Sequence, residues 1–172
     1  ISLLDRALIA QSINENRSIE EKDVRKMLGL ADKTKVISLL KEALSGKEKE
    51  SITILKELIN DGLDAKNFLN DILEVLYLFS RKINLGPIED DLSVSESELQ
   101  MVDQYSKNID MQDIGLFWQL TIKTIDDLRI VGNENLTLEM YVMQLIHLKN
   151  LEDKKETTNL NDSSSIETEN FS

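Results

Sequence analysis

Apolar residues recur every three to four positions along most of the chain, which predicts a series of amphipathic helices. The longest stripe follows Asp64 and keeps the helical period for about four turns, so we expect this helix to be buried from two sides. Its apolar positions are Phe68, Leu69, Ile72, Leu73, Leu76, Phe79 and Ile83. No stretch shows the convincing alternation of a half-buried strand. The pattern therefore predicts an all-α fold.

Capping residues indicate where several helices begin. Asp32, Asp64 and Asp110 each precede an apolar run, and an aspartate side chain can accept hydrogen bonds from the free amides of a first turn. Ser18 and Ser95 are each followed three residues later by Glu, the pattern of a capping box. We expect two helices over residues 1–13 and 18–28, and a third from Asp32 to Ser45-Gly46. A fourth contains Ile52 and Ile59 and ends at Gly62, and a fifth runs from Asp64 to about Ile83. The last three start at Ser95, run from Asp110 to Gly132-Asn133, and run from about Leu136 to Asn150.

Two segments interrupt this pattern. Residues 84–93 contain Gly86-Pro87 and the acidic run Glu89-Asp90-Asp91, which predicts a loop. Residues 151–172 are almost entirely polar, with 2 basic and 6 acidic side chains. Such a composition buries too little apolar surface to offset the entropy lost on ordering. We therefore expect an acidic, disordered tail or linker after Asn150.

Charge and composition exclude several functional classes. The 172 residues carry 20 Lys and Arg against 32 Asp and Glu, a net charge of -12 that disfavours direct binding to nucleic acid. With no cysteine, there is no disulfide, thiolate zinc site or cysteine nucleophile, and a reducing cytoplasm fits. No apolar run reaches the roughly 20 residues of a membrane helix, so we expect no membrane partner. Because the chain starts in mid-pattern at Ile1, we interpret it as a fragment.

Motifs for cofactor chemistry are absent from the sequence. It contains neither a P-loop nor a dinucleotide fingerprint, and one histidine without cysteine does not make a zinc site. The run Glu89-Asp90-Asp91 offers carboxylates that hard cations prefer, but it lacks EF-hand spacing. A solvated loop is the better interpretation. We expect no catalytic, cofactor-binding or metal-binding residue in this chain.

His147 leaves one enzymatic alternative open, a histidine phosphotransfer bundle. That chemistry needs an exposed histidine in the middle of a helix and a nearby cation for the phosphoryl group. We expect His147 to lie off the main apolar stripe, but Lys149 is two residues away rather than one turn away, and Asn150 is the expected helix end. We therefore disfavour this alternative. A helical adaptor of unrelated origin is a further one.

Aromatic residues on the last two predicted helices are candidates for either core or interface positions. Trp118 shares a helical face with Ile114, Thr121 and Ile125, which favours the core. Large aromatics also dominate interface hot spots, so a peptide-docking role stays open. The candidates are Phe117, Trp118 and Tyr141.

Several stretches of the sequence resemble the gamma/tau subunit of bacterial DNA polymerase III, a clamp-loader AAA+ ATPase. The run Ile1-Ser2-Leu3-Leu4-Asp5-Arg6-Ala7-Leu8 is similar to the lid helix of that family. Residues 23–30, which include Met27-Leu28-Gly29, resemble the end of the lid, where Met-Leu-Gly recurs among family members. Residues 113–119 and Leu138-Glu139-Met140 resemble the last two helices of the collar domain. The resemblance covers about residues 1–150.

The resemblance implies three regions. Residues 1–31 would be the C-terminal part of an AAA+ lid, residues 32–150 a helical-bundle collar for oligomerisation, and residues 151–172 a disordered polar linker. The nucleotide-sensing arginine of the family would precede Ile1, and Arg6 is no substitute for it.

The function implied is assembly of the complex that loads the sliding clamp onto DNA during replication. The collar would bind other loader subunits, namely further gamma/tau copies, delta and delta-prime. Sliding clamp and primer-template DNA would be contacted only through the whole complex. ATP with Mg would be bound by the full-length subunit, a cytoplasmic ATPase within the DNA-directed DNA polymerase III holoenzyme.

Overall fold

The computed structural model describes residues 23–24, 27–28, 31–88 and 94–169, with side chains described up to residue 160. Its elements are α3 (Lys33–Leu44), α4 (Glu48–Asn60), α5 (Ala65–Leu85), α6 (Glu96–Tyr105), the short 3-10 helix η1 (Ser106–Asn108), α7 (Met111–Asp127) and α8 (Glu134–Glu169). The described residues contain no strand, which confirms the all-α prediction. The helices predicted over residues 1–13 and 18–28, and the acidic run at residues 89–91, lie largely or wholly outside the described residues.

Four helices begin at the capping residues that the sequence predicts. Asp32 accepts a hydrogen bond from the Thr34 amide at 3.1 Å, and Asp64 accepts one from the Asn67 amide at 2.8 Å. Asp110 caps α7 through the amide of Gln112 at 3.0 Å. Ser95 and Glu98 form both hydrogen bonds of the capping box. Each such cap contributes about 1 kcal/mol to helix stability.

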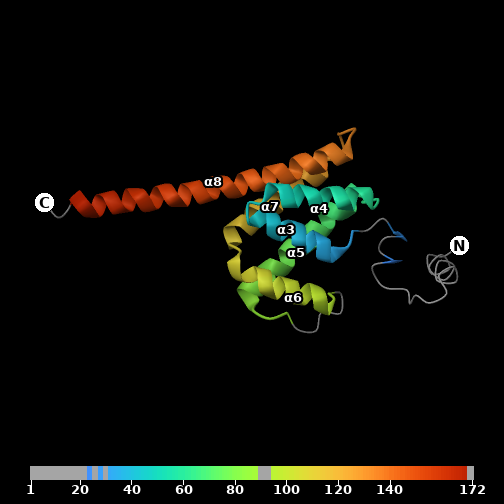
Figure 1. Cartoon of the computed structure of the whole chain (residues 1–172), viewed down its shortest axis with the longest axis horizontal. Coiled ribbons are helices and arrows are strands. Elements are labelled where there is room, and N and C mark those ends of the chain that lie inside the picture. Colours follow the sequence, from blue (N-terminus) through green and yellow to red (C-terminus); the bar gives the residue numbers. More distant parts are fainter. Residues whose placement is uncertain (1–22, 25–26, 29–30, 89–93, 170–172) are drawn as a thin grey trace.

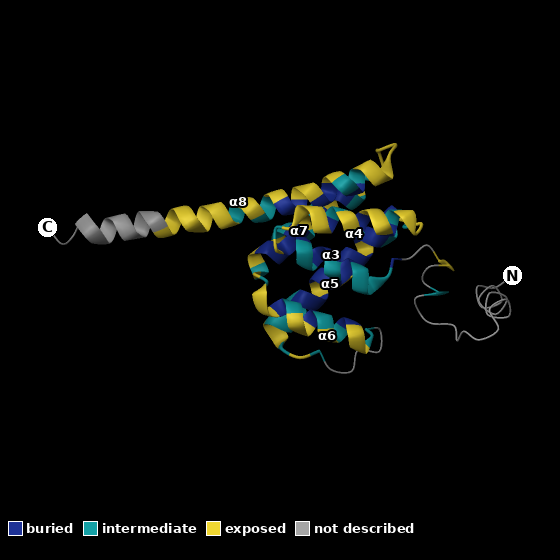
Figure 2. Cartoon of the chain, viewed as in Figure 1, coloured by how far each residue is buried: buried dark blue, intermediate teal, exposed yellow. Residues whose placement is uncertain are grey.

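The central element of the bundle is α5, which packs against α3, α6, α7 and α8. Figure 1 shows it crossing behind α3, with α6 alongside its C-terminal end, where Asn84 also contacts Met111 at the start of α7. Its stripe residues Phe68, Leu69, Ile72, Leu76 and Phe79 are fully buried, and so is Val75 beside the stripe. The other two stripe residues, Leu73 and Ile83, are half-buried. The two-sided burial predicted for this helix is therefore confirmed (Figure 2).

Glycines with positive φ follow α3, α4 and α5. Gly46 follows α3 with φ 74°, and Gly62 follows α4 with φ 89°, a region that glycine enters without a Cβ penalty. A Cβ added to Gly46 would lie 3.3 Å from Asn150 Oδ1 of α8. The turn after α3 therefore approaches α8 closely.

The predicted end of α7 at Gly132-Asn133 is wrong by about one turn. The helix ends at Asp127, and residues 128–130 form a turn in which the Arg129 and Ile130 amides bond to the carbonyls of Asp126 and Asp127. Asn133 instead caps the start of α8, where its side chain accepts from the Leu136 amide at 3.1 Å. A side-chain cap ahead of α8 competes with continuation of α7.

The predicted helix end at Asn150 is also wrong, because α8 continues to Glu169 through the segment expected to be a disordered tail. Residues 153–160 are all exposed, and in Figure 1 this part of α8 extends away from the bundle. Local interactions support the helical backbone there. Lys149 pairs with Asp153, Lys155 pairs with Glu152, and the Thr157 and Thr158 hydroxyls donate to carbonyls one turn earlier.

Candidate interaction surface

The pairing of α7 with α8 is specified by two polar contacts. Thr121 of α7 and Tyr141 of α8 bring their hydroxyl oxygens to 2.7 Å inside the core. Burial raises the pKa of Tyr141 above its usual range, so the phenol stays neutral. About two turns further along α8, Lys149 Nζ lies 2.8 Å from Asp113 Oδ2. Together these two contacts hold α8 against α7 at two points along its length.

Lys149 also reaches Asp153 on α8 itself, at 2.9 Å. Burial acts to lower the pKa of Lys149, but the hydrogen bonds to Asp113 and Asp153 outweigh it and raise the pKa overall. Asp113 is only 5% exposed, so its carboxylate depends on this cation. The ammonium of Lys149 is therefore committed to two carboxylates.

The three candidate aromatic residues occupy different depths. Phe117 and Tyr141 are buried in the core, whereas Trp118 is half-buried and packs against the edge of the core. The buried pair contributes to packing of this bundle rather than to its outer surface. Whether Trp118 contacts another subunit stays a prediction.

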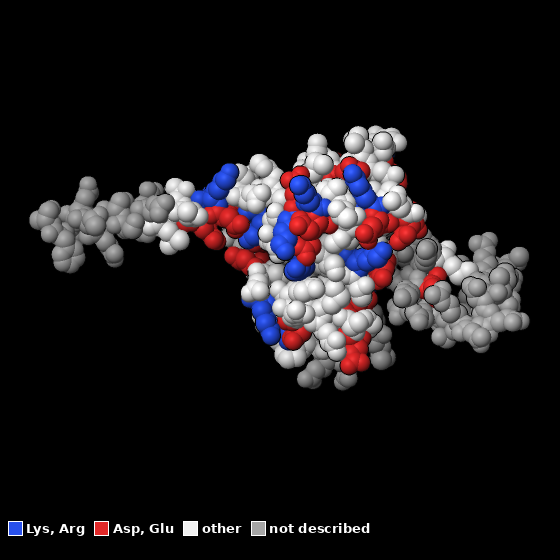
Figure 3. All heavy atoms as spheres, viewed as in Figure 1, with Lys and Arg blue, Asp and Glu red and all other residues white. Residues whose placement is uncertain are grey.

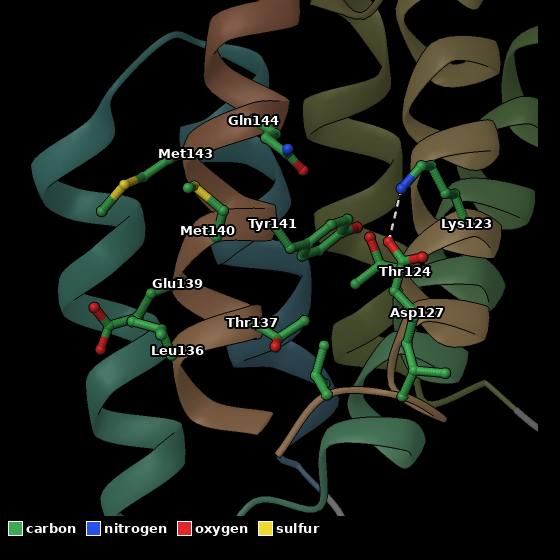
Figure 4. A pocket seen from close by; sticks show the side chains of 12 residues that line it. Lys123, Thr124, Asp127, Leu136, Thr137, Glu139, Met140, Tyr141, Met143 and Gln144 are labelled. Carbon is green, nitrogen blue, oxygen red and sulfur yellow. Dashed lines mark hydrogen bonds and ion pairs between the residues drawn. The ribbon is translucent and has the colours of Figure 1, made fainter. Parts of the chain in front are cut away.

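An apolar groove lies between the end of α7, the turn after it and the first half of α8. Its volume is about 450 Å³. Figure 4 shows Leu136, Met140 and Met143 in succession along α8, with Tyr141 lying between them and α7. These three side chains are 40% to 65% exposed, and Ile130 in the turn is 85% exposed. We call this site the α7–α8 groove; its lining also includes Lys123, Thr124, Asp127, Val131, Thr137, Glu139 and Gln144.

Charged groups border the groove unevenly. Lys123 Nζ pairs with Asp127 Oδ2 at 2.7 Å, and Arg129 pairs with Asp126 at 3.3 Å. Within the described part of the chain, Glu139, which lines the groove, forms no ion pair with a lysine or arginine. The groove thus combines an apolar lining with an excess of carboxylate.

A smaller hollow of about 280 Å³ lies between the loop after α5 and α6. Pro87, Ile88 and Leu99 contribute to its lining, together with the ion pair between Lys82 and Asp103. Glu96 also lines this hollow, so it too has one carboxylate more than it has cations. It differs from the α7–α8 groove because fewer exposed apolar side chains gather there.

His147 is exposed on α8, as expected from its place off the apolar stripe. Since α8 continues past Asn150, the histidine lies within the helix rather than at its end, and that argument against phosphotransfer is removed. Lys149 is nonetheless held by Asp113 and Asp153. The cation closest in sequence is therefore not free to hold a phosphoryl group.

The described residues hold no group of three His, Asp or Glu side chains placed to bind a metal ion. In the same part of the chain, none of the helices has the length and apolar character to cross a membrane. On the face in Figure 3, acidic and basic side chains are interspersed, so this face presents no continuous basic patch for a phosphate backbone.

The sequence prediction identified the buried stripe of α8 but missed the groove. Leu138, Tyr141, Val142, Leu145 and Ile146 are all buried, as predicted. The missed signal was a second apolar set at Leu136, Met140 and Met143, which share another face at helical spacing. Ile130 and Val131 were missed because α7 was predicted to continue past them.

Comparison with known proteins agrees with this architecture. Residues 19–160 match the family described as DNA polymerase III subunits gamma and tau domain III. The chain is 23% identical over 132 residues to the DNA polymerase III subunit gamma of Buchnera aphidicola subsp. Baizongia pistaciae (strain Bp). That alignment covers 76% of this chain and 36% of the relative, so the chain spans about a third of that protein. Because the family match extends over most of its length, the chain belongs to the DNA polymerase III gamma and tau domain III family.

Proposed function

We propose that this chain is a subunit-assembly domain of the DNA polymerase III clamp loader. Its task is to hold together the complex that loads the sliding clamp onto DNA during replication. The partners proposed are other gamma/tau copies, delta and delta-prime. Family membership supports a role in the polymerase III complex, and the exposed α7–α8 groove supports a role in association.

The groove is the observation that carries this proposal. Monomeric proteins rarely leave contiguous large apolar side chains in water, and a patch with a polar rim is typical of an interaction site. Ile130, Leu136 and Met140 are each more than half exposed, in contrast to the buried stripe of α8 that packs on the bundle. Covering these side chains would gain apolar burial that the isolated domain lacks.

The ATP-dependent steps are assigned to the rest of the subunit. We propose that ATP with Mg is bound by a domain that this chain does not include, and that residues 1–31 belong to the lid of that domain. Sliding clamp and primer-template DNA are then contacted through the whole complex. The net charge of -12 supports this division, because it disfavours direct contact with a phosphate backbone.

Light scattering after size-exclusion chromatography tests the proposal. The 172-residue chain is measured alone and with delta, delta-prime and full-length gamma/tau of the same organism. We expect defined complexes with at least one of these subunits at micromolar concentration. A chain that stays monomeric and binds none of them contradicts an assembly function.

A further inference from the structure

We propose that the α7–α8 groove binds an amphipathic α-helix of another protein subunit, one whose apolar stripe is flanked by lysine or arginine. This inference rests on the proposed assembly function and adds the chemistry of the partner segment. The shape of the groove, its methionine content and its charge carry the argument.

The dimensions of the groove suit a helix. Leu136, Met140 and Met143 lie at positions i, i+4 and i+7 of α8, so they form a row of about two turns, or roughly 11 Å. A docked helix presents its own apolar residues with the same repeat, and two such rows can interdigitate. The volume of about 450 Å³ accommodates several side chains rather than a single one. Ile130 and Val131 border the groove beside the start of α8.

Methionine makes the lining adaptable. Met140 and Met143 are 56% and 40% exposed, and their unbranched thioether side chains can adopt several rotamers. Such side chains adjust to the shape of a partner helix, as flexible apolar surfaces do at other helix-binding sites. The buried wall of the groove is more rigid, because Tyr141 is held by Thr121.

Electrostatics select a basic partner. The groove is lined by Lys123, which is already paired with Asp127, and by Glu139, which forms no ion pair within the described part of the chain. A lysine or arginine beside the apolar stripe of a partner can pair with Glu139. A second copy of this chain has a net charge of -12. Among the proposed gamma/tau partners, it would therefore fit this groove only through a helix with a lysine or arginine beside its apolar stripe.

Methionine methyl NMR provides a direct test, because the chain has five methionines. Met140 and Met143 line the groove, whereas Met101 and Met111 pack against the core elsewhere and serve as internal controls. The probes are two synthetic helical peptides of about 18 residues, long enough for a helix to form. They share one Leu and Met stripe, and their flanking positions are Lys in one peptide and Glu in the other.

We expect the Lys peptide to shift the methyl signals of Met140 and Met143 but not those of Met101 and Met111. The Glu peptide should bind at least about tenfold more weakly at low salt. Met140→Glu should abolish binding of the Lys peptide, whereas Leu151→Glu should not, since Leu151 is on the same helix but outside the groove. Glu139→Lys should weaken the Lys peptide and strengthen the Glu peptide.

Other outcomes overturn the inference. Equal binding of both peptides contradicts the basic partner, and shifts spread over all methionines contradict the groove as the site. Signals of Met140 and Met143 that change on diluting the chain alone identify a second copy as the occupant. Circular dichroism of each variant excludes unfolding as the cause of lost binding.

The loader subunits separate this inference from the proposed function. If Met140→Glu still forms complexes with delta, delta-prime or gamma/tau as readily as Leu151→Glu, assembly stands but the groove is not its interface. If the chain forms no complex with these subunits while the Lys peptide still binds in the groove, the assembly proposal is wrong and the groove serves another basic helix.

Discussion

The hydroxyl of Tyr141 on α8 donates a hydrogen bond to the hydroxyl of Thr121 on α7. The direction follows from a second contact, because Thr121 gives its single hydrogen to the Phe117 carbonyl at 2.6 Å. Its oxygen can then only accept from Tyr141, at 2.7 Å. A chain of hydrogen bonds thus runs from the backbone of α7 to the side chain of α8.

Removing the Thr121 hydroxyl should lower the free energy of unfolding more than removing the Tyr141 hydroxyl. In Tyr141→Phe, the Thr121 hydroxyl keeps its bond to Phe117, so we expect a loss of about 1 kcal/mol in the free energy of unfolding. In Thr121→Val, the buried phenol loses its acceptor, so we expect a larger loss of about 2 kcal/mol. Urea unfolding followed by circular dichroism measures both. A smaller effect for Thr121→Val than for Tyr141→Phe contradicts the assigned direction.

Lys149→Met should destabilise the domain by about 2 kcal/mol, because the buried carboxylate of Asp113 loses its cation. Lys154→Met is the matched control, since this neighbouring lysine is exposed. Its substitution should change the free energy of unfolding by less than about 0.5 kcal/mol. Chemical denaturation of the two variants checks the difference. Equal effects would mean that the ion pair does not hold α8 on α7.

The contribution of Lys149 should depend on pH at the alkaline end. Its pKa in the folded chain is raised above the ordinary value of 10.5, so its contribution is complete below pH 10.5 and declines as pH rises through the folded pKa. The free-energy difference between the native chain and Lys149→Met should therefore be constant near neutrality and shrink in strong alkali. Ionisation of Tyr141 on unfolding weakens both chains alike and cancels in the difference. A difference that grows with pH contradicts the assignment.

Lys155→Pro tests the exposed half of α8. Proline inside a helix costs about 3 kcal/mol, and the 14 residues beyond it to Glu169 are too few for a stable isolated helix in water. We expect a loss of helical circular dichroism with no change in the unfolding midpoint, because residues 153–160 are exposed. Lys155→Ala should change neither. A lowered unfolding midpoint would show that the segment packs on the bundle. An unchanged circular dichroism spectrum would show that the segment was not helical.

The helix starts were predictable because their signals are local. Asp32, Asp64, Ser95 and Asp110 each bond to an amide within three residues, so the sequence contains both partners. The buried stripe of α5 was predictable for a related reason, since its period alone places Phe68, Ile72 and Phe79 on one face.

The end of α7, the length of α8 and the groove were not predicted, because local sequence patterns do not determine them. The end of α7 was misplaced because Asn133, interpreted as a terminator, instead caps α8. The continuation past Asn150 was missed because a polar composition does not distinguish an exposed helix from a disordered segment. The groove was missed because Met140 looks like a core residue until the bundle shows which face of α8 is covered.

At 1.5 Å per residue, the 36 residues of α8 extend about 54 Å, and the part beyond Asn150 accounts for about 28 Å. A helix that extends this far from its bundle converts a rotation at its base into a displacement at its far end. A tilt of the bundle by 10° would move the far end of that part by about 5 Å, by simple geometry on the same rise per residue. Small rotations between neighbouring domains would thus become displacements as large as a strand spacing, in a direction set by the contacts of Lys149 with Asp113 and of Tyr141 with Thr121.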